Sequence, residues 1–131
     1  NTDYLSNEAL NCYPRLGINA ANIAPEFGVI ESKKILEIME ALKLRSLKDS
    51  FIKLSLDSNK WKKWMIKDSK ANDYEKAVIS GHYVFSEKKF LEIKENLVKI
   101  LKEKNQNLDK ILKKEIKDSI LRYLYNFNLI K

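Results

Sequence analysis

The stretch RLGINAANIAPEFG, residues 15–28, decides how the fold is interpreted, because it is the least helix-like part of a helix-rich sequence. Every glycine and proline of the chain except Gly81 lies in it or directly before it. A short apolar run at Leu16 and Ile18 leads into small and amide residues, followed by a proline and an acid. This order predicts a buried strand at residues 15–18, then a tight loop, then a helix.

The loop that follows this predicted strand is where a small-molecule site is expected. In strand–loop–helix architectures, ligands bind where the carboxyl end of the strand meets the loop. Asn19 and Asn22 are candidate substrate-binding residues, because their amides hydrogen-bond hydroxyls or phosphate and a helix N-terminus nearby favours an anion. The alternative is that both amides bond to their own backbone within a turn.

Two carboxylates are candidate catalytic residues. Asp3 follows a second predicted strand end, at residues 2–5, where a carboxylate orients sugar hydroxyls or acts as a base. A loop acid or a helix cap is the alternative for this residue. Glu26 lies just before a helix predicted to begin near Val29, and a helix N-terminus stabilises a negative charge by about 0.3–1 kcal/mol. A structural role is therefore sufficient to explain Glu26.

His82, the only histidine, is a third candidate for substrate binding, with packing beside Tyr83 as the alternative. Zinc sites need about three or four protein ligands. One histidine and one cysteine, Cys12, give no metal-binding pattern, and a lone cysteine excludes an internal disulfide. We therefore predict no metal ligands in this chain.

After residue 28 the apolar residues recur with helical spacing. The spacing predicts helices at residues 29–44 and 47–56, a segment with Trp61 and Trp64 on one face, and a short helix at residues 73–82. Two long helices follow, divided by a break at residues 105–107. Their apolar stripes are broad. The tryptophans, with Tyr83 and Phe85, are expected to lie in the core rather than to stack on a sugar.

Three serines precede predicted helices and are candidate N-terminal caps. Ser6 precedes a short helix that runs through Leu10. Ser46, with Asp49 three residues later, precedes the helix at residues 47–56. Ser86 precedes the first of the two long helices.

The charge pattern argues against a nucleic-acid partner. The net charge is +7, but the cations are 22 lysines and only 3 arginines, and glutamates alternate with the lysines on helical faces. A solvated helix surface explains this pattern, whereas nucleic-acid readers use arginine for bidentate contacts. No apolar run approaches the roughly 20 residues of a membrane span. We expect a cytoplasmic protein with no membrane partner.

Several segments resemble the C-terminal part of the GatZ/KbaZ-like subunit family of class II tagatose-bisphosphate aldolase. They are Thr-Asp-Tyr at the start followed by Leu-Ser, the stretch at residues 15–28, KWKKWM at residues 60–65 and ISGHYVFS at residues 79–86. The resemblance weakens after Phe90. It implies a mainly α chain, the helical C-terminal fragment of a TIM-barrel (β/α)8 protein, with one or two short strands near its N-terminus. Residues 1–56 would form the last strands and helix of the barrel, and residues 57–131 a helical C-terminal extension.

The resemblance implies a function in ketohexose-phosphate (tagatose and galactitol) metabolism. The parent protein would be a non-catalytic accessory subunit that supports a zinc-dependent aldolase subunit, with a sugar phosphate as ligand and the divalent metal in the full-length protein or its partner. The loop departs from better-known members because it is richer in amides and carries an acid. One alternative is a ketohexose-phosphate epimerase. Another is a helical oligomerisation or interaction module without catalysis, for which self-association is expected because the apolar stripes are broad.

Overall fold

The computed structural model describes residues 2–131, which form a mainly helical chain. The helices, in order, are α1 (Asn7–Arg15), α2 (Pro25–Ala41), α3 (Arg45–Asp57), the 3₁₀ helix η1 (Lys60–Trp64), α4 (Asp73–Ser80), the 3₁₀ helix η2 (Gly81–Val84), α5 (Lys88–Glu103) and α6 (Leu108–Asn126). The sequence-based prediction of a mainly α chain is confirmed.

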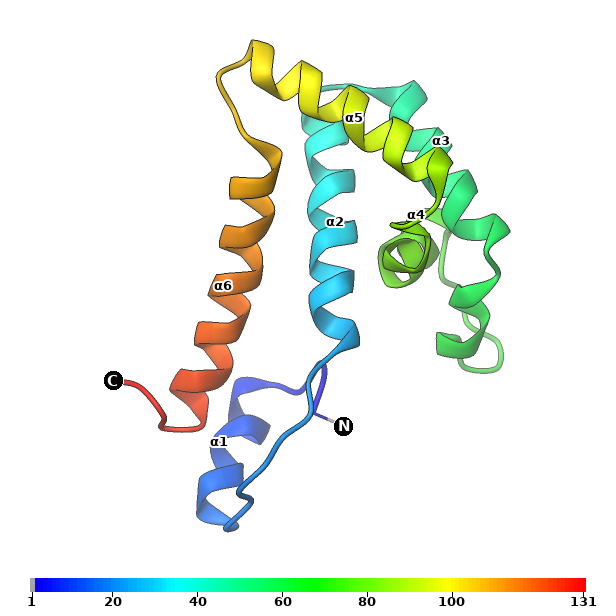
Figure 1. Cartoon of the computed structure of the whole chain (residues 1–131). Coiled ribbons are helices and arrows are strands. Elements are labelled where there is room, and N and C mark those ends of the chain that lie inside the picture. Colours follow the sequence, from blue (N-terminus) through cyan, green and yellow to red (C-terminus); the bar gives the residue numbers. More distant parts are fainter. Residues whose placement is uncertain (1) are drawn as a thin grey trace.

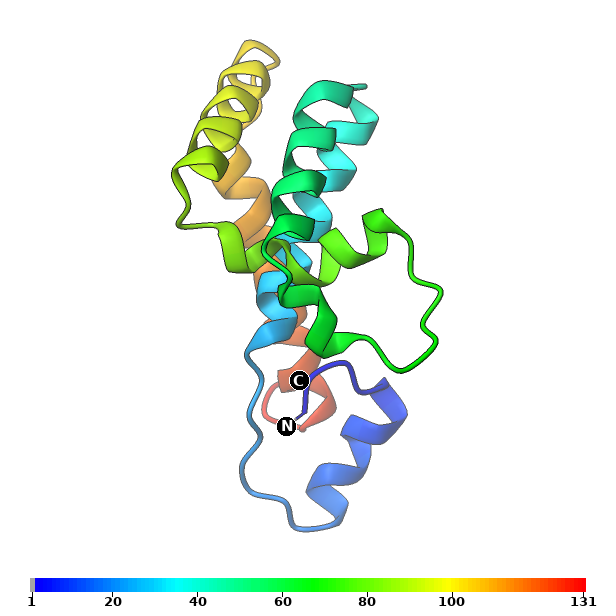
Figure 2. The same ribbon diagram turned by 90° about the vertical axis from the view of Figure 1, so that its right-hand side faces the viewer.

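The four long helices form a bundle around α2 (Figure 1). Helix α3 returns beside α2, α5 crosses over one end of both, and α6 runs back alongside α2. Helix α4 packs between α2 and α3. Residues 2–6, α1, the loop that follows it and the C-terminus lie at the opposite end of the bundle from the crossing of α5, as the rotated view also shows (Figure 2). This terminal end of the molecule contains four of the five candidate site residues, Asp3, Asn19, Asn22 and Glu26.

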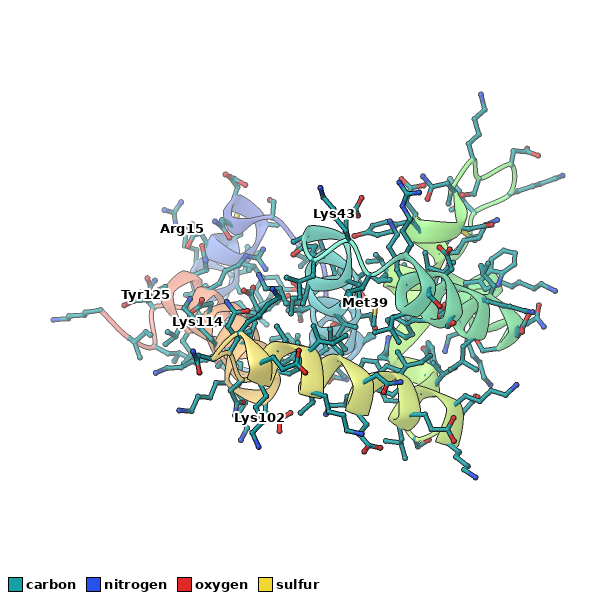
Figure 3. The ribbon with its side chains drawn as sticks, turned by 90° about the horizontal axis from the view of Figure 1, so that it is seen from above. Arg15, Met39, Lys43, Lys102, Lys114 and Tyr125 are labelled. Carbon is teal, nitrogen blue, oxygen red and sulfur yellow. The ribbon has the colours of Figure 1, made fainter. Side chains whose placement is uncertain are left out.

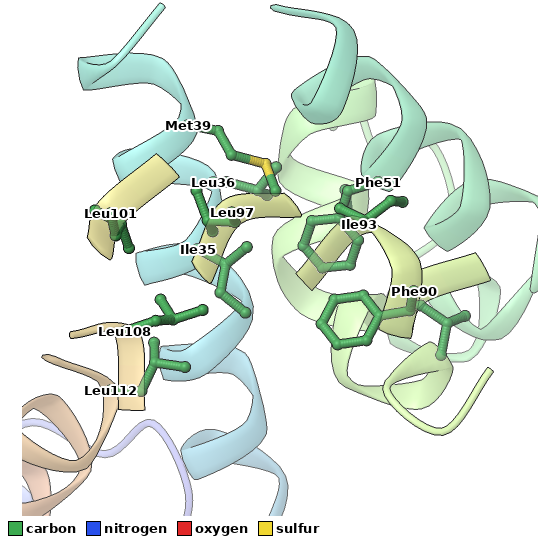
Figure 4. Packing of buried hydrophobic residues seen from close by; sticks show 12 residues of the cluster. Ile35, Leu36, Met39, Phe51, Phe90, Ile93, Leu97, Leu101, Leu108 and Leu112 are labelled. Carbon is green, nitrogen blue, oxygen red and sulfur yellow. The ribbon is translucent and has the colours of Figure 1, made fainter. Parts of the chain in front are cut away.

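One cluster of apolar side chains holds the bundle together (Figure 4). Helix α2 contributes Leu36 and Met39, and α3 contributes Phe51, all fully buried. The Phe51 ring lies 5.2 Å from the ring of Phe90 in α5. Seen from above, Met39 lies between α2 and α3, whereas labelled lysines such as Lys102 point outward (Figure 3). The helical periodicity after residue 28 is therefore confirmed by burial.

A glycine allows η2 to approach α2 and α3 closely. A Cβ atom on Gly81 would lie 2.7 Å from Cζ of Phe51 and 2.8 Å from Oγ of Ser32. No real Cβ tolerates such distances, so only glycine fits here. The Ser32 hydroxyl donates to the carbonyl of Gly28 at 3.0 Å, which satisfies it inside the core.

The strand predicted at residues 15–18 is wrong. Those residues end α1 instead: the N–H of Gly17 donates to Pro14 O at 3.3 Å and that of Ile18 to Tyr13 O at 3.0 Å. Gly17 has φ +70°, so this is a Schellman cap with glycine in the left-handed position. A strand needs a partner to pair with, and residues 2–131 contain none, while the cap satisfies the end of a helix already present.

The strand end predicted at residues 2–5 is also wrong. Residues 3 and 4 form a turn, and Tyr4 has φ 65°, in the left-handed region. A single backbone hydrogen bond, from Thr2 N–H to Asn22 O at 2.9 Å, ties the segment to the loop before α2. One such bond brings the two segments together at a single point, whereas a pair of strands needs a repeated series of backbone hydrogen bonds.

Of the three predicted caps, one is confirmed. The Ser6 hydroxyl accepts from Ala9 N–H at 3.2 Å and caps α1, which extends beyond the predicted Leu10 to Arg15. The predictions for Ser46 and Ser86 are wrong. Helix α3 begins one residue before Ser46, and α5 begins two residues after Ser86; neither has a side-chain cap.

The core crosses the predicted boundary at residue 56. Leu36 and Phe51 on one side of that boundary share a cluster with Phe90, Leu97 and Leu101 on the other. Whether the chain derives from a barrel, and whether residues 57–131 are an extension, stay predictions. The broad stripes of the two long helices are only partly covered, and they leave Leu91, Val98, Ile120 and Tyr125 exposed.

Candidate functional site

The two predicted catalytic carboxylates meet at the start of α2. The N-cap residue of this helix, Ala24, has no capping side chain. Asp3 takes its place from the N-terminal segment: its Oδ1 accepts from the backbone N–H groups of Ala24 at 3.1 Å and Glu26 at 2.9 Å. A carboxylate at this position satisfies orphan donors and complements the helix dipole. Asp3 is therefore the N-terminal cap of a helix that begins more than twenty residues later.

Glu26, in the first turn of α2, in turn accepts a hydrogen bond from the N-terminal segment. Its Oε2 accepts from the backbone N–H of Tyr4 at 2.8 Å and from the hydroxyl of Tyr123 in α6. Its Oε1 is paired with the Arg122 guanidinium at 3.4 Å. Because the Glu26 residue is only 9 % exposed, these contacts replace water around its charge.

Arg122 extends the network to the start of α1. Its Nε donates to Asn7 Oδ1 at 2.8 Å, and its Nη2 donates to the carbonyl of Leu5. We call Asp3, Glu26, Arg122 and Tyr123 the terminal lock, because they join the N-terminal segment, α2 and α6. The lock connects parts of the chain that are about a hundred residues apart in sequence.

The electrostatics of the lock keep its phenol protonated. Burial raises the pKa of Tyr123 to about 12, the Glu26 carboxylate adds to that increase, and Arg122 opposes it. Burial and the nearby charges of Asp3 and Glu26 also raise the pKa of Tyr4 to about 12. A protonated Tyr123 donates its hydrogen bond across the whole physiological range. The lock as arranged is suited to holding the fold, and catalytic roles for Asp3 and Glu26 stay predictions.

The predicted binding loop lines a hollow of about 520 Å³ beside the lock, which we call the terminal hollow. Two helix ends frame it: α1 ends at the Gly17 cap, and α6 ends at a matching cap in which Asn128 is left-handed and Leu129 N–H donates to Leu124 O at 2.9 Å. The lining is mainly apolar and aromatic, and consists of Tyr13, Pro14, Ile18, Asn19, Ala20, Ala21, Ile23, Phe27, Ile120, Tyr123, Leu124, Phe127 and Leu129.

The two predicted asparagines are placed differently. Asn19 lines the terminal hollow. Asn22 is exposed in the same loop, and its carbonyl accepts the bond from Thr2, but its side chain is not part of the lining. The structure therefore brings one of the two amides to the hollow.

His82 lies elsewhere, against the first turns of α2. Its ring packs so closely on Gly28 that a Cβ there would come within 2.6 Å of Cγ. The ring lies 4.1 Å from that of Tyr83, and burial together with the nearby Lys63 lowers the pKa of His82. Its Nδ1 is buried with no hydrogen-bond partner among residues 2–131. His82 does not line the terminal hollow, and its role in substrate binding stays a prediction.

Sequence reasoning missed Arg122 and Tyr123, the half of the lock that lies in α6. Their positions in a long helix rich in isoleucine and leucine gave no sign of a polar contact. One signal was available: Arg122 is one of 3 arginines in a chain with 22 lysines. Arginine is the residue that reaches several oxygens at once in a fixed geometry.

Residues 2–131 contain no group of three or more histidine, cysteine, aspartate or glutamate side chains placed to hold a metal ion. None of the helices in that range has the length and apolar character needed to cross a membrane. In comparisons with known proteins, the chain matches no family model, no curated protein and no solved structure. The geometry of the terminal end is therefore the basis for a functional assignment.

Proposed function

We propose that this chain is a non-catalytic helical interaction module that pairs with a second copy of itself through the terminal hollow. The observation that carries the proposal is a concentration of exposed apolar side chains at one end. Of the exposed large hydrophobic residues in the described chain, Ile18, Ile120 and Leu129 line the hollow; Leu16 lies two residues before Ile18 in the sequence, and Tyr125 follows the lining residue Leu124. We call these five residues the apolar rim.

An apolar rim around a hollow is typical of a protein-binding surface. Monomeric proteins rarely expose contiguous apolar patches larger than roughly a few hundred Å², and larger ones mark interaction sites. Leu16 is 72 % exposed and Leu129 is 67 % exposed, so both side chains lie far out in solvent. Covering them removes apolar surface from water, which favours association.

A second copy fits this surface because the surface carries both a recess and projecting side chains. In a two-fold dimer, each subunit uses the same patch, so a residue that projects must meet a recess on the same patch of its partner. Leu129 is exposed and lines a hollow of about 520 Å³. The lining is uncharged, and no lysine or arginine from residues 2–131 contributes to it, so an apolar occupant fits better than a sugar phosphate.

Solution mass across a concentration series tests the proposal. We expect the wild-type chain to form a dimer at micromolar concentrations and Leu129→Glu to be monomeric, because the substitution places a charge in the hollow. Leu91→Glu is the matched control: Leu91 is 52 % exposed but lies in α5 and does not line the terminal hollow, so the dimer of this variant should persist. Each chain carries +7, so added salt should tighten an apolar dimer by screening repulsion.

A wild-type chain that stays monomeric at all concentrations would contradict the proposal. So would equal dissociation of the Leu91→Glu and Leu129→Glu variants. The accessory-subunit hypothesis predicts a different partner, a zinc-dependent aldolase subunit, and the epimerase alternative predicts turnover of tagatose 6-phosphate by the full-length parent alone. Both stay predictions that follow from the resemblance.

A further inference from the structure

A second surface lies on another side of the bundle, at residues 59–70, which we call the basic loop. It comprises η1 and the segment that leads toward α4, and it projects from the bundle (Figure 2). It contains five lysines and one acid, Asp68. All five lysine side chains are exposed, and none is ion-paired within the described part of the chain. The five are Lys60, Lys62, Lys63, Lys67 and Lys70.

The basic loop has one acid for its five lysines, whereas glutamates and aspartates are interspersed with the lysines of the long helices and pair with several of them. Lys34, for example, lies 3.0 Å from Glu115, and Lys99 lies 3.0 Å from Glu95. Ion pairs of that kind neutralise the field of the lysines that form them. The basic loop has no such compensation, so its positive potential extends into solvent and attracts an anionic partner.

Two half-buried tryptophans hold the basic loop on the bundle. The Trp61 indole N–H donates to Leu56 O at 3.1 Å, and the Nζ of Lys76 lies 4.6 Å from its ring centre. The Nζ of Lys63 lies 4.5 Å from the ring of Tyr83 and 5.1 Å from that of Trp64. These cation–π contacts and the indole hydrogen bond tie the rings to the bundle.

The loop exposes an apolar side chain that lies among the lysines in the sequence. Ile66 is 81 % exposed, the highest value among the chain's exposed large hydrophobic residues. It lies in a local turn in which Ser69 N–H donates to Ile66 O at 3.1 Å. An exposed isoleucine beside uncompensated lysines suits a partner that is anionic at its surface and apolar just beneath.

We propose that the basic loop is a docking surface for an anionic lipid bilayer. The lysines would lie against the headgroup phosphates, and Ile66 would reach the boundary with the acyl chains. Nucleic acid fits less well, because it offers Ile66 no apolar phase and the loop has no arginine fork. The expectation of no membrane partner rested on the lack of a spanning segment, and docking on a bilayer surface requires no such segment.

Vesicle flotation of the whole chain tests this inference. One set of vesicles is phosphatidylcholine alone, and the other contains roughly one-third phosphatidylserine. We expect binding to the anionic set only, and a loss of about a hundredfold in affinity for the triple variant Lys60→Gln, Lys67→Gln, Lys70→Gln, at about fivefold per lysine. These three lysines make no ion pair or cation–π contact within residues 2–131, so the fold should be retained.

The matched control removes the same charge from a different surface. Lys110, Lys113 and Lys117 are exposed on α6 and form no ion pair in the described residues, and their triple glutamine variant should bind anionic vesicles like the wild type. Ile66→Ser should weaken binding most at high salt, where the apolar contact remains after screening. Equal losses in both triple variants would overturn the proposal, as would equal binding to both vesicle types. Binding to a fluorescent single-stranded oligonucleotide without binding to vesicles would replace the bilayer with nucleic acid.

Discussion

The core around α2, α3 and α5 and the terminal end of the molecule are held together by different kinds of contact. In the core, fully buried apolar side chains such as Leu36, Phe51 and Leu97 pack on one another. At the terminal end, Asp3 and Glu26 accept hydrogen bonds from backbone N–H groups, and Glu26 also binds Arg122 and Tyr123 of α6. Apolar packing tolerates many partners of similar size, whereas each lock contact requires one particular partner. The two regions should therefore respond differently to substitution.

The largest effect is expected in the core, from Phe51→Ala. The Phe51 ring is fully buried and contacts the ring of Phe90, so its removal leaves a cavity as well as losing apolar burial. Substitutions of this kind cost about 3–5 kcal/mol, which approaches the whole stability of a small domain. Urea unfolding measures the loss. Leu91→Ala, an exposed leucine of α5, is the control and should change stability by less than about 0.5 kcal/mol. A small effect at Phe51 would mean that the core is not centred there.

The core was also the part that the sequence predicted well. Helical spacing of apolar residues indicated α2, α3, α5 and α6 to within a few residues, because burial repeats with the period of the helix. The start of α2 was placed near Val29 rather than at Pro25. Proline is favoured in the first turn of a helix, but the pattern of residues 19–28 also suits a loop, and the prediction assigned Pro25 to that loop.

The terminal end was predicted only in part. A short apolar run such as Leu16 and Ile18 looks the same whether it enters a strand or ends a helix. These residues end a helix because Gly17 adopts the left-handed conformation of a helix cap, and because the described chain contains no strand with which they could pair. Asp3 and Glu26 were recognised as notable acids, but the contact with Tyr123 depends on how α6 folds back, and local pattern contains no information about that.

A middle-sized effect is expected in the lock, from Glu26→Gln. The amide keeps the shape but loses the charge that Arg122 and Tyr123 face. Hydrogen bonds to charged groups contribute about 1.5–3 kcal/mol, and we expect a loss of stability in that range by urea unfolding. Glu40→Gln is the control, because Glu40 is 61 % exposed and its pair with Lys48, at 3.5 Å, should contribute little. Equal losses of unfolding free energy in the two variants would show that the contacts of Glu26 contribute no more to stability than an exposed ion pair does.

Alkaline titration provides a second readout of the same variant. The Glu26 charge helps to raise the pKa of Tyr123 to about 12, so Glu26→Gln should lower that pKa, while burial keeps it above the ordinary value. Tyrosines of the unfolded chain ionise near pH 10. The unfolded state therefore releases protons first, and the folded state loses stability as the pH rises from about 10 toward 12. That alkaline loss should be smaller in Glu26→Gln, as measured by ultraviolet absorbance and unfolding at each pH.

The smallest effect is expected from Gly17→Ala, and it bears most directly on how the terminal end is built. A Cβ at Gly17 meets nothing within 4 Å, so the cost comes from the backbone angle of φ +70° alone. A left-handed alanine costs about 1–2 kcal/mol, and the stiffer unfolded chain offsets part of that, leaving a net loss of about 1 kcal/mol. Asn128→Gly at the matching cap of α6 should be neutral or slightly stabilising, because Asn128 already occupies the left-handed region at φ 57°. A strand at residues 15–18 would give the opposite result, because alanine or valine at position 17 suits extended backbone at least as well as glycine does. Unchanged or increased stability of Gly17→Ala would therefore contradict the helix cap and favour the strand.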